Sequence, residues 1–254
     1  MKLKNITYIA LFTTVLFSSC GKDSKFDCFK RTGDETTEIR DISGFNKIQI
    51  NGKLDVVFVS EDNDLSISGG ENLLPKIITK IQDSTLIIDN ENKCNWTRSY
   101  KKGEILVSIP INKLNEIEIN GFGSVESIDT INADNLKINY VTGISNLNII
   151  VKSTNLELVV HDGGGDIVIS GISKNVNIYN NGYAYVDLGK LKSNYVFLAN
   201  KSQNKTFINA NNRIDVEIYD VGDVFYTGNP TEINFTPYSS GKLIELEWYY
   251  NFRR

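Results

Sequence analysis

The chain contains one histidine, His161, which lies in the glycine-rich stretch HDGGGD beside Asp162 and Asp166. An imidazole between carboxylates has the donor groups of a metal site or a general base. Without a second histidine, however, a zinc triad or a Ser-His-Asp triad would need unusual partners. The GGGDIVI segment also resembles a calcium-binding nonapeptide, but such repeats act in tandem and this one occurs once. We therefore interpret the stretch as an exposed turn and expect no metal or cofactor.

A second candidate for chemistry is the carboxylate pair Asp220 and Asp223 in DVGDV. Two nearby carboxylates are the groups that glycosidases use as acid and base or nucleophile. Nothing in the sequence places a basic or aromatic partner opposite them, and aspartates in turns are commonly structural. The chain also lacks the P-loop, dinucleotide and nucleophile-elbow motifs. We expect no catalytic residues and no enzymatic activity.

Aromatic residues gather toward the end of the chain, and several have the parity of outward-facing positions on strands. Three of these, Tyr179, Phe197 and Tyr219, form our candidate ligand-binding surface, because exposed rings bind sugars or partner proteins. The alternative is that the rings pack against a C-terminal segment that covers the end of the fold. The full set comprises Tyr179, Tyr183, Tyr185, Tyr195, Phe197, Tyr219, Phe225 and Tyr226.

The elements that would position these residues follow a period of twenty. The stretches NLKI (135–138), NLEL (155–158) and NVNI (175–178) repeat an asparagine, an apolar residue, a polar residue and an apolar residue. Continuing at the same step gives two columns that are entirely aliphatic. These are Leu136, Leu156, Val176, Val196 and Val216, and Ile138, Leu158, Ile178, Leu198 and Ile218.

A constant period indicates stacked units, none of which can bury its apolar face alone. Twenty residues suit one coil of a parallel β-helix, with aliphatic side chains about 4.8 Å from their copies in the next coil. Asn135, Asn155 and Asn175 would form a ladder, which Tyr195 and Asp215 interrupt. An antiparallel sandwich or barrel also has closely spaced strands. Such folds do not require the interval of twenty residues to stay constant over five consecutive repeats.

Shorter alternating segments precede the repeat and predict an N-terminal set of strands. A helical turn is expected in ENLLPKI (71–77), where Pro75 keeps it short. The polar QDS inside IITKIQDSTLII (77–88) predicts a hairpin. The expected strands are 47–50, 54–59, 64–68, 85–89 and 104–109.

The first twenty residues contain Lys2 and Lys4, an apolar run and the sequence LFSSC. This pattern predicts a secretory signal in residues 1–20. The end resembles a lipoprotein box in which Cys20 is acylated, which would anchor the protein to a membrane outside the cytoplasm. An ordinary signal peptide with an incidental cysteine is the alternative. The polar residues 21–38 would then form a tether.

Two cysteines remain, Cys28 and Cys94, and in an exported protein they are predicted to form a disulfide. Such a bond would close a long loop and contribute roughly 4 kcal/mol. Free or intermolecular thiols are the other possibility.

The net charge is −4 at pH 7, and without the signal it is about −6, from 25 basic and 31 acidic residues. Acidic and basic residues are interspersed along the chain. We therefore expect no basic footprint for nucleic acid or for an anionic membrane surface, since both need clustered Lys and Arg.

The stretch ISGFNKIQINGKLDVVFV, with the later INGFGSV and DGGGDIVISG, resembles the head GIN domain family, DUF2807, known from Bacteroidetes-type lipoproteins. The resemblance implies a right-handed parallel β-helix over residues 39–230. Residues 39–112 would form its N-terminal strands, 113–230 its regular coils and 231–254 a capping segment. It also implies a cell-envelope binding or adhesion module that recognises a glycan or a protein. A structural scaffold and a carbohydrate-active enzyme are the alternatives.

Overall fold

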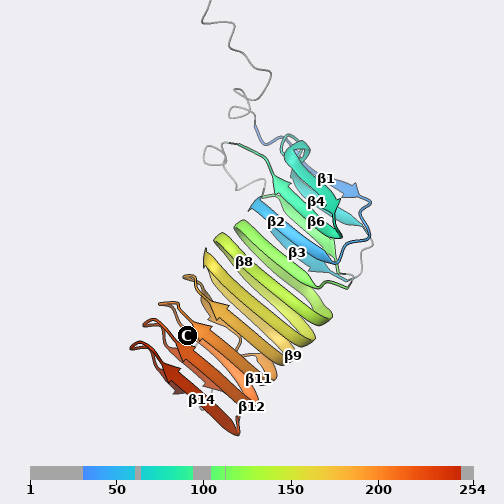
Figure 1. Ribbon diagram of the computed structural model, residues 1–254. Helices are drawn as coiled ribbons and strands as arrows, with labels where there is room; N and C mark the ends of the chain where they lie inside the picture. The colour runs from blue at the N-terminus through green and yellow to red at the C-terminus, as the bar shows by residue number, and fades with distance from the viewer. Residues whose placement is uncertain (1–30, 61–63, 94–103, 112, 247–254) are drawn as a thin grey trace, which may run out of the picture. The chain divides into compact units, whose positions relative to one another are not determined.

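The computed structural model describes residues 31–60, 64–93, 104–111 and 113–246 (Figure 1). Contacts within the chain divide it into residues 1–31 and 93–98 and a larger unit of residues 32–92 and 99–254. All that follows concerns the larger unit. Within the described ranges, none of the helical structure is long and apolar enough to span a bilayer.

The larger unit is a β-solenoid of about five turns, with about 20 residues per coil (Figure 1). It confirms the predicted fold class. Its strands are β1 (Glu35–Arg40), β2 (Lys47–Lys53), β3 (Asp55–Val59), β4 (Leu65–Gly70), β5 (Ile77–Gln82), β6 (Thr85–Asn90), β7 (Leu106–Pro110), β8 (Glu116–Gly164), β9 (Asp166–Asn180), β10 (Tyr185–Asp187), β11 (Leu191–Asn200), β12 (Thr206–Ile218), β13 (Val224–Thr227), β14 (Glu232–Pro237) and β15 (Leu243–Glu245).

The predicted aliphatic columns are rows of buried side chains. Leu156 in β8 lies beside Val176 in β9, which lies beside Val196 in β11, always twenty residues on. Leu136, Leu156 and Val176 are almost completely buried in the same core. Each lap alone exposes this apolar row, so stacking onto the next lap is what removes it from water.

The last step of both columns is wrong. Val196 lies beside Ile214, and Leu198 lies beside Val216, so β12 follows β11 after eighteen residues. The register shifts between Ser193 and Tyr195, where the pairing is irregular. The predicted pattern does not exclude this register, because a slip of two residues keeps every side chain on its original face of the sheet. As a consequence, Tyr195 lies over Arg213 and not over Asp215.

The N-terminal strands enter the same stack. β2 pairs in parallel with β8 sixty-nine residues later, and β3 also pairs with β8 (Figure 1). On their other side, β2 pairs with β6 and β3 with β7, again in parallel. The antiparallel strands β1, β4 and β5 complete this end. β1 begins at Glu35, before the expected domain boundary at residue 39.

Two local predictions are confirmed. The hairpin forms between β5 and β6, with Asp83 and Ser84 both at positive φ, as in a two-residue turn between paired strands. The helical turn is a short 3-10 segment, Leu74–Lys76, which contains Pro75. At the other end, β14 and β15 pair in parallel with β12 and β13, so the coils continue beyond residue 230. A capping role for 231–254 stays a prediction.

Candidate functional site

The candidate site lies on one sheet face of the last coils, which we call the aromatic face. It consists of the outward side chains of 175–181 in and after β9, 195–201 in and after β11, 213–219 in and after β12 and 232–238 in and after β14. The buried Val196, Leu198, Val216 and Ile218 alternate with them, and this alternation is what points their neighbours outward. Figure 1 shows these strands lying side by side.

Two of the predicted ligand-binding rings touch on this face. The ring centroids of Tyr179 and Phe197 are 5.7 Å apart and the planes are tilted by 57°. Tyr179 is 40% exposed, while Phe197 is half-buried. Tyr195, 43% exposed, precedes Phe197 by two residues on the same face. Tyr179 and Phe197 therefore offer a small platform of partly exposed aromatic surface, which suits contact with a sugar ring or an apolar side chain.

The third predicted ring, Tyr219, is held between neighbours from the adjacent laps. Its ring stacks on Tyr238 with centroids 4.5 Å apart and an angle of 13°. The Lys201 ammonium lies 5.2 Å from the Tyr219 centroid, which favours a cation-π interaction. The Tyr219 hydroxyl donates to Glu217 at 2.8 Å. A ligand would thus reach this hydroxyl and its neighbours more readily than the ring faces.

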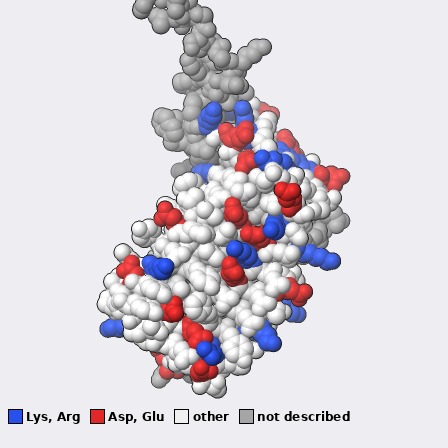
Figure 2. Space-filling model, in the orientation of Figure 1, with Lys and Arg blue, Asp and Glu red and all other residues white. Residues whose placement is uncertain are grey.

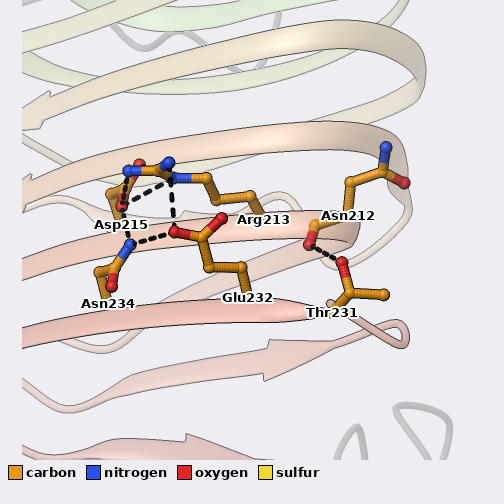
Figure 3. Close-up of polar contacts among 6 residues, drawn as sticks. All are labelled: Asn212, Arg213, Asp215, Thr231, Glu232 and Asn234. Carbon is orange, nitrogen blue, oxygen red and sulfur yellow. Dashed lines mark hydrogen bonds and ion pairs between the residues drawn. The ribbon is translucent and has the colours of Figure 1, made fainter.

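A polar cluster follows on the same face (Figure 3). Arg213 donates to Asp215 through Nε at 2.8 Å and contacts Glu232 at 3.2 Å. Asn234 donates to both Asp215 and Glu232, at 2.8 and 3.0 Å. The hydrogen bond from Arg213, with a second from Asn234, holds the pKa of Asp215 below its usual value. These side chains satisfy one another, so the cluster stabilises the β12–β14 edge and presents little free charge.

The predicted asparagine ladder borders the aromatic face. Asn175 donates to Asn155 and Asn155 donates to Asn135, each at 2.7 Å. Asn135 and Asn155 also line a hollow of about 1300 Å³, which has both polar and apolar side chains in its lining. Asn177, which lies beside Phe197 in the register, lines the hollow as well. Asn177 therefore belongs to both the hollow and the aromatic face.

The candidate catalytic residues have ordinary structural partners. His161 is exposed and its Nε2 lies 3.1 Å from Asn139 Oδ1. Asp220 accepts the backbone N–H of Val221 at 2.8 Å, and Asp223 accepts that of Lys242 at 2.9 Å. In the described ranges, no three His, Cys, Asp or Glu side chains lie close enough to hold a metal ion. The two aspartates bond the backbone at turns.

The remaining aromatic residues belong to other surfaces. Tyr185, Phe207 and Phe225 form a second stack on the opposite strands, with centroids 5.6 and 4.9 Å apart. Phe207 was not among the predicted residues, because its position in this stack depends on the register. Tyr226 is largely buried in the core. Cys20, Cys28 and Cys94 lie outside the described residues, so the anchor and the disulfide stay predictions.

The hydrogen bond between Tyr219 and Glu217 leads to a testable prediction about the pKa of Tyr219. The Glu217 carboxylate accepts a hydrogen bond from the phenol and raises the pKa of Tyr219 to about 12, with burial as a second cause. Glu217→Gln should lower this pKa toward 10, as measured by ¹³C-tyrosine NMR titration. Because the folded-state pKa is raised, the associated stabilisation is present below about pH 10 and disappears as the pH rises through 12. An unchanged Tyr219 titration in Glu217→Gln, with Glu157→Gln as the control, would contradict this assignment.

Comparison with known proteins places this architecture in a family. Residues 44–230 match the family described as "Putative auto-transporter adhesin, head GIN domain", so the chain belongs to the head GIN domain family. No curated protein matches the chain.

Solved structures share the fold. A "putative adhesin" of Bacteroides fragilis is 24% identical, with a TM-score of 0.76 over 84% of this chain and 97% of that one. A "Putative lipid binding protein" of Parabacteroides distasonis is 18% identical, with a TM-score of 0.61 over 85% and 98% of the two chains. A "putative adhesin" of the same species is 15% identical, with a TM-score of 0.55 over 84% and 98%.

Proposed function

We propose that the protein is an extracytoplasmic adhesion module that binds a glycan through the aromatic face. The observation that carries this proposal is the contact between Tyr179 and Phe197, two partly exposed rings on a flat sheet face. Exposed apolar surface on a sheet face marks an interaction site, because a ligand that covers the rings removes them from water. The family's description as an adhesin head supports the same role.

The neighbouring polar groups favour a sugar over an apolar ligand. Amide side chains of Asn175 and Asn177 lie beside Tyr195 and Phe197 in the register. Amide groups donate and accept hydrogen bonds, which matches a sugar hydroxyl. The hollow lined by Asn177, Asn155 and Asn135 would accommodate further units of an extended chain. This arrangement supports an oligosaccharide lying across the laps.

The experiment replaces Tyr179, Phe197 and Tyr219 together by alanine and measures binding to a glycan array and thermal unfolding. We expect at least tenfold weaker binding. The melting temperature should fall by only a few degrees, because Tyr179 and Tyr219 are both 40% exposed, although Tyr219 loses its contacts with Tyr238 and Lys201. The matched control replaces three exposed apolar residues elsewhere, Ile39, Phe122 and Ile144, and should bind normally. A large loss of melting temperature with unchanged binding would instead show a packing role. Turnover of an arrayed polysaccharide would favour an enzyme.

The anchor belongs to this proposal, because an adhesin acts outside the cell. Acylation at Cys20 would attach the chain through the 21–34 segment that precedes β1. Cells expressing the chain and grown with labelled palmitate should label it, whereas Cys20→Ser should stay unlabelled. Protease treatment of intact cells would then show whether the domain lies at the surface. Labelling that persists in Cys20→Ser would remove the anchor from the proposal.

A further inference from the structure

A narrow edge of the solenoid joins the two sheet faces where residues 150–154, 170–174 and 190–194 run side by side. Lys152 lies beside Ile172, and Ile172 lies beside Lys192, in neighbouring strands. The buried Val151, Ser173 and Leu191 alternate with outward side chains. We call these outward residues the basic edge: Ile150, Lys152, Ile172, Lys174, Lys190 and Lys192, all of them exposed.

Three lysines of the basic edge, Lys152, Lys174 and Lys192, carry uncompensated positive charge. The three segments contain four lysines and no Asp or Glu. Lys152, Lys174 and Lys192 form no ion pair with any carboxylate in the described part of the chain. Lysines elsewhere do pair, as Lys47 does with Glu116 and Lys137 with Glu157. The net charge of the chain is −4, and the face shown in Figure 2 mixes Lys and Arg with Asp and Glu. A group of lysines without acidic neighbours in these segments would attract an anionic partner.

Exposed isoleucines lie among these lysines. Ile172 is 55% exposed and Ile150 is 38% exposed. Ile128, 68% exposed, comes from the preceding lap, where the Ser127 hydroxyl accepts the Ile150 N–H at 2.8 Å. A branched apolar side chain gains nothing from a soluble polyanion, but it gains free energy in the hydrocarbon boundary of a bilayer. Lysine stems allow the ammonium groups to remain at the headgroups while the isoleucines lie deeper.

We propose that the basic edge docks on an anionic lipid surface. The lysines contact lipid phosphates and the isoleucines enter the interface between headgroups and acyl chains. Docking lays the edge of the coils against a membrane and leaves the aromatic face, which belongs to a different side of the laps, open to ligand. The inference does not rest on the glycan proposal, although Lys152 also lines the hollow that adjoins the aromatic face.

The test measures partition onto vesicles by sedimentation, with the chain of residues 21–254. This chain keeps every described residue and omits the apolar run that would itself enter lipid. We expect binding to vesicles of phosphatidylcholine with 30% phosphatidylglycerol and none to phosphatidylcholine alone. Replacing Lys152, Lys174 and Lys192 by glutamine should weaken binding roughly 100-fold at low salt. The control with the same charge change, Lys80, Lys113 and Lys242 to glutamine, should weaken it less than about threefold.

A second pair of variants separates lipid from soluble polyanion. Ile150→Ser with Ile172→Ser should weaken vesicle binding at least fivefold while leaving any binding to dextran sulfate unchanged. Equal binding to neutral and anionic vesicles, or an equal loss in both lysine variants, would overturn the proposal. So would strong dextran sulfate binding together with vesicle binding that the isoleucine changes leave intact, because the edge would then be a polyanion site.

Discussion

Replacing Gly163 by alanine should lower the free energy of unfolding by about 3 kcal/mol, since an added methyl group has no room. A Cβ at this position would come 1.8 Å from the Tyr140 ring, far inside van der Waals contact. Tyr140 is fully buried and cannot turn away. Its hydroxyl bonds the carbonyls of Ser145 and Gly164 and accepts the Ser145 N–H. The melting temperature should fall by roughly 6 to 12 °C.

The next glycine provides the matched control. A Cβ on Gly164 would meet only Ile144 Cγ1 at 3.9 Å, an ordinary contact. Gly164→Ala should therefore change stability by less than about 0.5 kcal/mol. Chemical denaturation of both variants measures the difference. Equal stability of Gly163→Ala and Gly164→Ala would mean that the Tyr140 ring does not occupy its described position.

Truncating the middle of an inner row should have a comparable effect. Leu158 is completely buried and lies beside Ile178 of the next lap. Leu158→Ala removes three side-chain carbon atoms and leaves a cavity that rigid strands cannot close. The expected loss is about 2 to 4 kcal/mol. The midpoint of urea unfolding should fall, with an unchanged slope if the same surface is exposed.

An exposed isoleucine of similar size is the control for this row. Ile144 is 66% exposed, so Ile144→Ala should cost less than about 0.5 kcal/mol. A small effect at Leu158, or a loss at Ile144 as large as that at Leu158, would show that the two side chains do not differ in burial. This result would contradict the claim that the buried aliphatic row containing Leu158 stabilises the solenoid.

Much of the fold was predictable from single segments. The alternation in 155–160 and 175–180 fixes which side chains face inward, and the constant interval between these segments predicts laps that stack. The asparagine ladder follows from the same interval, and it ends at Tyr195 as expected. The site was predictable in part: Tyr179 and Phe197 do touch, and Tyr219 lies on the same face, although its ring is held by Lys201 and Tyr238.

The step from Val196 to Ile214 could not be predicted from pattern. A slip of two residues replaces Val216 by Ile214, one buried aliphatic residue by another, and preserves the parity of the strand. The hydrophobic periodicity therefore does not distinguish a pairing of Val196 with Ile214 from a pairing with Val216. The pairing of β2 with β8 across sixty-nine residues is likewise invisible, because the intervening strands have the same alternation.

By itself the sequence determined the repeating lap, its inward rows and the asparagine ladder, because side-chain parity and a fixed interval are properties of the chain alone. Only the tertiary structure decided which outward residues are neighbours. Lys152, Lys174 and Lys192 follow no common interval in the sequence, and their charges are diluted among acidic residues on either side. Stacked laps place them within adjacent strands around Ile172. The sequence alone does not predict this cluster, since charge acts over distances in space and not along the chain.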